Sequence, residues 1–316
     1  MHGFLLVDKP EGITSQDVIT QLQHALVTRS GGKLKKRDLP SMGHGGTLDP
    51  FATGLLVVAI GDGVKLTRYL LGSEKTYEAE VSFGSRTASG DLTNEVVART
   101  DSIPRDESLL RSKAKEFLER PYLQTPPMYS AKKIDGTPLY ELARKGIEVE
   151  RAAIECSVRE FLVLETARAP SGGISKARIF TRVSSGTFIR TLAEDWAIHM
   201  GSLAHLTTLR RVSSGPLSLD QATPLKTLVD RALNGTPWAE GPGFLPFHRA
   251  LDGILPRLEI DSETARRVFQ GEIRTIQGLP LPSNDSIALY AENHLVAVVR
   301  EHKVERGFPL RFKDNL

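Results

Sequence analysis

The sequence contains a single cysteine, Cys156, among 316 residues. One cysteine excludes an intramolecular disulfide and any zinc site built from several cysteines. The eight histidines are scattered, with no HxxxH or HxH pair, so no local motif favours a metal site. No apolar run approaches the ~20 residues that a membrane helix needs. The N-terminal segment MHGFLLVDKPEG lacks the basic residues that open a signal peptide. These absences fit a cytoplasmic protein and give a metal site no local support.

Charge of one sign is also scarce, because 41 Lys and Arg residues nearly balance 38 Asp and Glu residues, leaving a net charge of +3. The basic residues are nevertheless clustered in three segments, residues 29–38, 209–211 and 263–274. Any one of these clusters is typical of a solvated loop or helix face. Together they hint at a polyanionic partner. Apolar residues make up 40 % of the chain, which is enough for one large domain, or for a large and a small one.

Strands and helices are mixed along the chain without a regular βαβ repeat, which favours an α+β fold. A helix is expected from Thr14, where Thr14 and Ser15 are good N-caps and Asp17 suits the first turn. The segment LLVVAI reads as a strand buried on both faces, and TYEAEVSF alternates like a half-buried strand. The predicted strands are residues 4–7, 55–60, 76–83, 155–165 and 176–183, and the further predicted helices are residues 107–121, 138–146 and 189–201.

The composition changes at residues 234–256, where GTPWAEGPG is dense in glycine and proline, so we expect a linker or domain boundary there. Beyond it we expect a helix over residues 262–270. A hairpin is expected over residues 286–301, turning at Glu292 and Asn293. These features predict a small β-barrel domain. The expected division is residues 1–250 and residues 251–316.

The most unusual segment is GHGGTLDPFATGLLVVAIG, residues 43–61, in which a glycine-rich loop runs directly into a buried strand. A nucleotide-binding loop is disfavoured, because the glycines are not followed by Gly-Lys-Ser/Thr entering a helix. A glycosidase needs a second carboxylate about 5 to 9.5 Å from the first. Only Asp49 lies in this loop, although Asp91 or Asp195 could be brought to it by the fold.

A third hypothesis makes Asp49 a lone ionised nucleophile. A free Asp titrates near ~3.9 and is charged at neutral pH, but in a pocket it needs a counter-charge. Arg190, in SSGTFIRTLAEDW, is a plausible partner because it lies where a strand gives way to a helix.

Six segments resemble motifs of the TruB family of pseudouridine synthases, in the family's order and over residues 4 to about 217. GHGGTLDPFATGLL resembles its catalytic motif and LLVDKPEGITS its N-terminal one. KTYEAEVSFG, PPMYSAKKIDGTPLYELARKG, GTFIRTLAED and AHLTTLRRVSSGPL are similar to the remaining four. The tail from about Gly253 looks like a divergent PUA domain, an RNA-binding module. The resemblance implies a catalytic domain with a central mixed, largely antiparallel sheet flanked by helices, plus a small C-terminal PUA-like β-barrel.

The resemblance also implies the reaction, conversion of the uridine at position 55 in the T loop of tRNA to pseudouridine, without metal or cofactor. Asp49 matches the catalytic Asp, which either attacks C1′ or initiates a glycal route. His44 matches a loop His near the flipped-out nucleotides, and Tyr77 a Tyr that stacks on the target base. Arg190 matches the Arg that pairs with the catalytic Asp, and Leu209 an apolar pocket residue. The implied partner is the T stem-loop of tRNA, bound by a monomer.

Two positions depart from the family pattern. Phe188 replaces a Tyr of the family pattern. This replacement keeps a ring that can stack on the base and removes the hydroxyl group. Ser185 replaces a Lys, which removes one possible phosphate contact. The rival from another class is an RNA-binding protein that has lost catalysis. The intact set of Asp49, Tyr77 and Arg190 argues against it.

Overall fold

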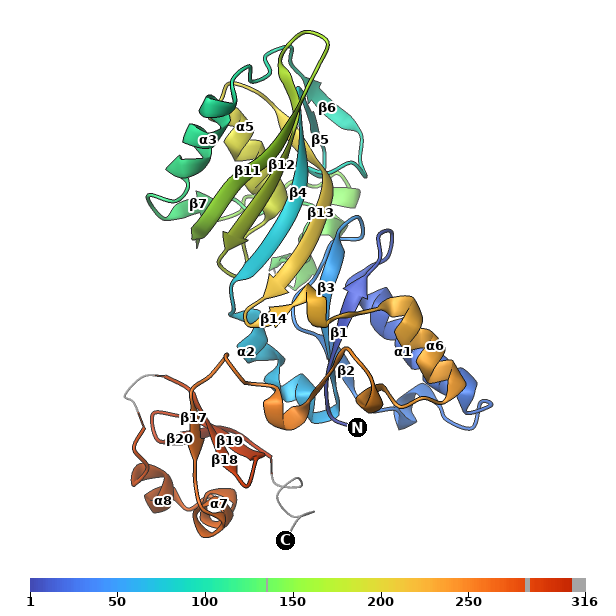
Figure 1. Ribbon diagram of the computed structural model, residues 1–316, viewed down its shortest axis with the longest axis vertical. Helices are drawn as coiled ribbons and strands as arrows, with labels where there is room; N and C mark the ends of the chain where they lie inside the picture. The colour runs from blue at the N-terminus through green and yellow to red at the C-terminus, as the bar shows by residue number, and fades with distance from the viewer. Residues whose placement is uncertain (135, 282–284, 309–316) are drawn as a thin grey trace.

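The computed structural model describes residues 1–134, 136–281 and 285–308, and its main body is built on one long twisted sheet (Figure 1). The sheet runs in the order β11-β12-β4-β13-β3-β1-β15, with β14 paired to β13, β16 to β1 and β2 to β3. The β1–β15 and β13–β3 pairs are parallel and the other pairs are antiparallel. The prediction of a mixed, largely antiparallel sheet is confirmed. The strands are β1 (Gly3–Lys9), β2 (Met42–His44), β3 (Thr53–Ile60), β4 (Lys75–Phe83), β11 (Val158–Arg168), β12 (Ile174–Val183), β13 (Ala204–Ser214), β14 (Leu217–Ser218), β15 (Thr223–Pro224) and β16 (Phe244–Pro246).

Helices cover this sheet at two places (Figure 1). α1 and α6 pack together beside β1, and α3 and α5 lie against the upper strands. The predicted start of α1 is confirmed, because Thr14 and Asp17 form a reciprocal capping box. The predicted helix over residues 107–121 is shorter, ending at Glu116. The helices are α1 (Ser15–Arg29), α2 (Thr67–Leu71), α3 (Glu107–Glu116), α4 (Leu139–Arg144), α5 (Ile189–Ile198), α6 (Leu225–Asn234), α7 (Ser262–Phe269) and α8 (Ile273–Gln277), with 3₁₀ turns η1 (Lys36–Asp38), η2 (Gly61–Leu66), η3 (Leu219–Gln221), η4 (Trp238–Glu240) and η5 (Phe247–Arg249).

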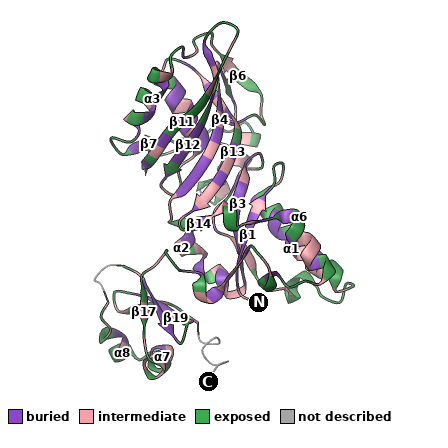
Figure 2. Cartoon of the chain, in the orientation of Figure 1, coloured by how far each residue is buried: buried purple, intermediate pink, exposed green. Residues whose placement is uncertain are grey.

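Both faces of β1 and β3 are buried, which explains the continuous apolar runs at residues 4–7 of β1 and 55–60 of β3 (Figure 2). On β1, Leu5 and Val7 belong to the core beneath α1 and α6, whereas Phe4 and Leu6 belong to a second core on the other face. Because successive side chains of a strand point to opposite faces, a strand covered on both sides must be apolar at every position. β3 is therefore held immobile between two cores, directly behind the loop that carries Asp49.

Gly54 allows β3 to meet β13 closely enough for this arrangement. Its φ is +98°, and a Cβ built on it would lie 2.3 Å from the carbonyl oxygen of Arg211. Any side chain at this position would therefore collide with the main chain of β13. Position 54 therefore requires glycine because the main chains of β3 and β13 lie in contact there.

A second sheet is formed near the C-terminus in the order β17-β18-β19-β20, with α7 and α8 beside it (Figure 1). It confirms the predicted hairpin, which turns at Glu292 and Asn293 with positive φ at both residues. Closure of these strands into a barrel stays a prediction, as does the domain assignment, whose last residues, 309–316, lie outside the described part. The strands are β17 (Arg257–Glu259), β18 (Ile287–Ala291), β19 (His294–Arg300) and β20 (Lys303–Gly307).

Of the two alternatives predicted for residues 234–256, the linker is wrong, whereas a domain boundary stays a prediction. Trp238 is buried, and β16 within this segment pairs with β1 in the large sheet. The second sheet also packs on the main body, because Tyr290 and Val298 share a core with Phe4 of β1. The glycines and prolines of this segment serve tight turns between packed pieces, a use that composition does not distinguish from a linker.

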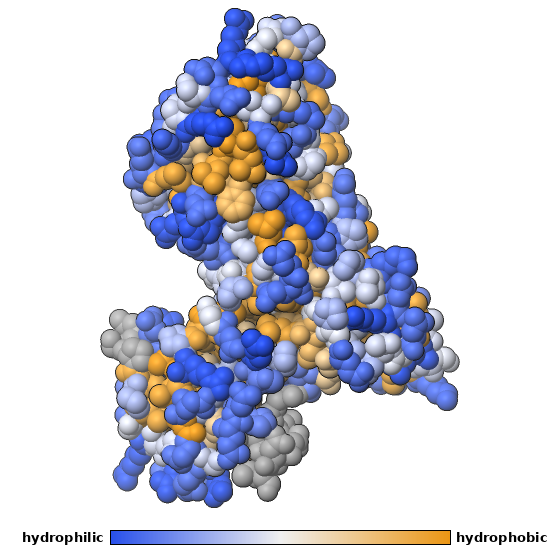
Figure 3. Space-filling model, in the orientation of Figure 1, coloured by the Kyte–Doolittle hydropathy of each residue, from blue (hydrophilic) through white to orange (hydrophobic). Residues whose placement is uncertain are grey.

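Three short strand pairs form separate two-stranded sheets. The outermost strand of the large sheet, β11, exposes apolar side chains. Figure 3 shows an apolar patch on the surface over the upper sheet. Leu162 and Leu164 of β11 are 51 % and 39 % exposed. The pairs are β5 (Ser85–Thr87) with β6 (Val96–Arg99), β7 (Tyr122–Gln124) with β10 (Ile154–Cys156), and β8 (Lys133–Ile134) with β9 (Thr137–Pro138). Within the described residues, no helix is both long and apolar enough to cross a membrane.

Candidate active site

The loop after β2 and the first turn of α5 enclose a cavity of about 280 Å³ together with β4 and β13. It contains five of the six site residues predicted from the sequence. These are Asp49, Tyr77, Phe188, Arg190 and Leu209. These five residues come from four separate sequence motifs, and Ala131 and Lys132 of the PPMYSAKKIDG segment add a fifth motif to the lining.

Asp49 and Arg190 form a close ion pair at this pocket, with 2.9 Å between Arg190 Nε and Asp49 Oδ2. Arg190 is 3 % exposed at its side chain, whereas 32 % of the Asp49 side chain reaches solvent. The arginine is therefore a buried support, and the carboxylate is the member of the pair that an incoming molecule can touch. Two main-chain carbonyls, of Ser89 and Tyr129, accept from the outer nitrogens of Arg190 and fix its orientation.

Burial raises the pKa of Asp49, and the nearby charge of Arg190 opposes this rise. Asp91 raises this pKa further, and Lys9 lowers it. Burial thus favours the neutral form of this carboxyl group, and the adjacent Arg190 favours its charged form.

Asp91 is a second acid beside Arg190, with 3.7 Å between Asp91 Oδ2 and Arg190 Nη1. Its side chain is 5 % exposed and accepts from the hydroxyl of Ser89 (2.7 Å) and from the main-chain N–H of Thr93 (2.9 Å). Asp91 does not line the pocket, and Asp195 instead pairs with Tyr122 in a different hollow. Neither acid that the glycosidase hypothesis needed therefore faces the pocket beside Asp49.

Two buried cations brace the loop that carries Asp49. Lys9, fully buried, donates from Nζ to the carbonyls of Ile13 (2.8 Å) and Pro50 (3.3 Å). Arg211, 2 % exposed, donates to the carbonyls of Leu55 (2.8 Å) and Gly46 (3.1 Å). Each links the loop to a different strand, so the position of Asp49 is set from both sides.

One part of the pocket wall is apolar and aromatic, and Lys75, Lys132, Thr47 and Thr187 also line the pocket. Tyr77 and Leu209 are 8 % and 6 % exposed and come from the neighbouring strands β4 and β13. Phe188 stands at the N-cap of α5, two residues before Arg190. A flat apolar surface beside a carboxylate can hold a planar ring by stacking while its attached sugar meets the charge.

His44 is the exception among the predicted site residues. It lies on β2, opposite Val58 of β3, and does not line the pocket. Its Nδ1 is buried with no hydrogen-bond partner in the structure, and burial lowers its pKa. Within the described residues, no group of three or more His, Cys, Asp or Glu side chains is arranged to hold a metal ion.

The three basic segments differ in how far their charges are exposed and paired. Residues 31–38 are exposed throughout, as a basic loop should be. In the second segment, however, Arg210 pairs with Asp8 at 2.8 Å and Arg211 is buried, so neither is a free surface cation. In the third, Arg266 and Arg267 are exposed and both pair with Glu263.

Sequence reasoning missed Lys9, Asp91 and Arg211 as parts of this site. From the sequence, Lys9 is given no role, and the cluster that contains Arg211 is described as typical of a solvated face. Asp91 was considered only as a second catalytic acid. A charged residue inside an apolar strand pattern, such as Arg211 within AHLTTLRRVSS, was the available signal, because such a residue is either at an edge or paired.

Comparison with protein families matches residues 34–189 to the TruB family pseudouridylate synthase, N terminal domain. The tRNA pseudouridine synthase B of Psychrobacter cryohalolentis is 36 % identical over 299 residues, which cover 94 % of this chain and 78 % of that protein. The protein of the same name from Ralstonia nicotianae is 38 % identical over 290 residues, covering 92 % of this chain and 86 % of that protein.

Two solved structures share the fold. A chain of a Cbf5-Nop10-Gar1 complex matches with a TM-score of 0.71 and 23 % identity, covering 98 % of this chain and 86 % of that chain. A chain of an H/ACA RNP bound to a substrate RNA containing 2′-deoxyuridine matches with a TM-score of 0.67 and 21 % identity, covering 94 % and 77 %. At these identities the likeness supports the fold and carries nothing about partners.

Proposed function

Because the chain belongs to the TruB family of pseudouridylate synthases, we propose that it converts the uridine at position 55 of the tRNA T loop to pseudouridine. The observation that carries the proposal is the pairing of a solvent-accessible Asp49 with a buried Arg190 at 2.9 Å, in a pocket walled by Tyr77, Phe188 and Leu209. A reaction at the sugar carbon of a flipped-out nucleotide needs a carboxylate beside the ribose and a flat surface for the base.

In this reaction the N1–C1′ bond of uridine breaks, the uracil turns, and a C5–C1′ bond forms. C5 loses its proton and N1 gains one, so the product is an isomer of the substrate. Asp49 supplies the carboxylate, either by attack on C1′ or by starting a glycal route. Arg190 holds it charged, and Tyr77 stacks on the base. Phe188 and Leu209 complete the pocket, with no hydroxyl at position 188.

The enzyme must take the uridine out of its stack, at a cost of a few kcal/mol that is smallest in a loop. We place the RNA backbone along the exposed basic loop, residues 31–37, and assign His44 to the nucleotides that flank the target. Recognition is then mainly of T-loop shape, with phosphate contacts adding affinity that falls with salt.

We also propose that residues 251–316 form a PUA-like RNA-binding domain joined to a catalytic domain of residues 1–250. A second sheet with its own small core, including Leu289 and Val299, supports this division. Replacing Arg266 and Arg267 by Gln should weaken tRNA binding. It should also flatten the salt dependence by a slope of about 0.7 to 0.9 per lost phosphate contact. An unchanged slope would remove α7 from the RNA interface.

The enzyme is further proposed to act as a monomer in the cytoplasm, where tRNA is its substrate. Sedimentation of the purified chain with and without tRNA tests the monomer, since a dimer at working concentration would contradict it.

The proposed function is tested with tRNA transcripts labelled with tritium at C5 of uridine. Wild-type protein should release one tritium per tRNA, and a transcript with cytidine at position 55 should release none. Asp49→Asn should bind tRNA and release none, because the amide keeps the shape and loses the charge. Free uracil in the products would indicate a glycosidase. Binding without tritium release by the wild type would indicate an RNA-binding protein without catalysis.

A further inference from the structure

A fully buried amide, that of Gln124 at the end of β7, grips the main chain of the pocket residue Phe188. Its Oε1 accepts from the N–H of Phe188 at 2.7 Å, and its Nε2 donates to the carbonyl of the same residue at 3.0 Å. One side chain thus satisfies both main-chain groups of one residue. Phe188 is the N-cap of α5 and has no side-chain group that could cap the helix, so Gln124 takes over part of that role.

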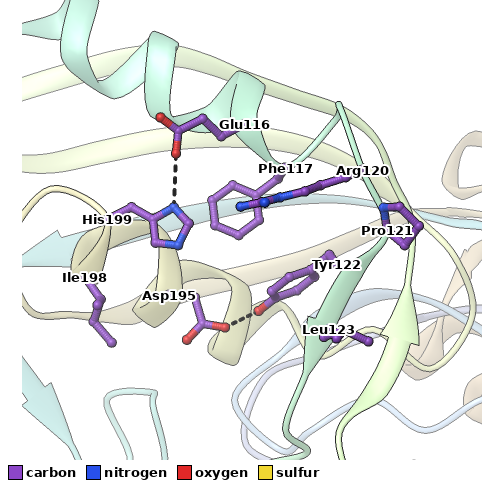
Figure 4. A pocket seen from close by; sticks show the side chains of 9 residues that line it. All are labelled: Glu116, Phe117, Arg120, Pro121, Tyr122, Leu123, Asp195, Ile198 and His199. Carbon is purple, nitrogen blue, oxygen red and sulfur yellow. Dashed lines mark hydrogen bonds and ion pairs between the residues drawn. The ribbon is translucent and has the colours of Figure 1, made fainter.

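The amide is itself oriented by a second contact. Its Nε2 also donates to the hydroxyl of Tyr122 at 3.1 Å, and that hydroxyl donates in turn to Asp195 Oδ2. Figure 4 shows Tyr122 and Asp195 pointing toward each other at a hollow of about 410 Å³. Because the tyrosine proton goes to Asp195, its oxygen must accept, and only the NH₂ end of Gln124 can donate to it. The flip state of the amide is therefore fixed by its neighbours.

Phe188 and Arg190 share the first turn of α5, so whatever fixes the main chain of Phe188 also fixes the base of the Arg190 side chain. We propose that Gln124 is a positioning residue for the isomerisation: it sets the first turn of α5, and with it the Phe188 ring and the Arg190 guanidinium, relative to Asp49. This inference rests on the proposed function. Gln124 does not line the pocket, so it acts through Phe188 and Arg190 without touching the substrate.

The test compares Gln124→Glu with the wild type and with Gln21→Glu, a matched change at an exposed position of α1. A glutamate at position 124 keeps the shape and can accept from Phe188 N–H. When ionised, it can donate to neither the Phe188 carbonyl nor Tyr122. We expect kcat on tRNA to fall by about 10- to 100-fold, the range for small misplacements of catalytic groups, with KM nearly unchanged. The acid limb of the pH–rate profile should move to higher pH, because a displaced Arg190 no longer stabilises the charge of Asp49. Gln21→Glu should match the wild type in both.

Tyr122→Phe removes one oxygen atom and leaves the pair between Gln124 and Phe188 in place, so its loss of kcat should be smaller. If Gln124→Glu fails to fold, Gln124→Met should show the same fall in kcat and the same shift of the acid limb. If neither variant folds, the kcat of Tyr122→Phe tests the inference. A folded Gln124 variant with wild-type kcat and an unmoved acid limb would overturn the inference, as would a wild-type Tyr122→Phe where it alone can be measured. Failure of the wild type to form pseudouridine would instead overturn the proposed function.

Discussion

Removing the guanidinium of Arg190 should raise the pKa of Asp49 and slow turnover most at low pH. Arg190→Met leaves Asp49 without its partner at 2.9 Å and leaves Asp91 as an unopposed negative charge behind it. Breaking a buried pair in this way costs about 3–5 kcal/mol. Because 32 % of the Asp49 side chain meets solvent, we take the lower end of this range, which at 1.36 kcal/mol per tenfold corresponds to a rate about 100-fold lower where Asp49 must be charged.

The measurement is single-turnover tritium release between pH 5 and pH 9 at saturating enzyme. The acid limb should move to higher pH, and the rate on that limb should fall by up to about 100-fold, because a smaller fraction of Asp49 is charged there. Arg190→Lys is the control. It keeps a charge while losing the fork that reaches two carbonyls, so its acid limb should stay near that of the wild type at reduced kcat. A profile of Arg190→Met that superimposes on the wild type would show that Arg190 does not govern the charge of Asp49.

Three further changes test other parts of the structure. Asp91→Asn should lower kcat by loosening Arg190 yet move the acid limb to lower pH, because Asp91 raises the pKa of Asp49; a shift to higher pH would contradict this. Burial lowers the pKa of Lys9 from 10.5 to about 8. Between pH 8 and pH 10.5 the unfolded chain therefore binds one more proton at Lys9 than the native state, and the free energy of unfolding rises with pH across this range. Urea unfolding should therefore show wild type gaining roughly 3 kcal/mol over Lys9→Met from pH 8 to 10.5, and parallel curves would contradict it. Phe308→Ala should lower the free energy of unfolding of the whole chain by about 3–5 kcal/mol, because its ring packs edge-on against Phe247 at 5.0 Å in the core shared with β1; a separate transition of the tail alone would argue against a shared core.

The parts of the site that carry a local pattern could be predicted from the sequence. Asp49 stands in a glycine-rich loop before a doubly buried strand, and Arg190 at the start of a helix, and both features are visible within a few residues. The individual strands of the sheet followed from alternating and continuous apolar runs in the same way, whereas their largely antiparallel arrangement was implied by the family resemblance. These features depend on neighbours along the chain, which is the information a single sequence contains.

The bracing of the site could not be predicted in this way. Lys9 is buried because carbonyls from two other segments accept hydrogen bonds from it. Gln124 is bonded to Phe188, which lies 64 residues away along the chain and becomes its neighbour only in the folded structure. Before the fold is known, a lysine beside a proline and a glutamine before a threonine read as turn and surface residues. The segment around Trp238 shows the same limit, since its glycines and prolines predict a linker until β16 is seen to pair with β1.

The position of β1 in the sheet has a consequence for how the chain is made. One edge of β1 pairs with β3, which follows soon after it, but its other edge pairs with β15 and β16, which end at residue 246. At a synthesis rate of about 5–20 residues per second, that edge waits on the order of 10–50 s for its partners to leave the ribosome. During this time the apolar strand Gly3–Lys9 presents an unpaired edge, which is the kind of surface that templates aggregation. The nascent chain is therefore most in need of chaperone protection at its first strand, and the need ends only when the segment around β16 closes the sheet.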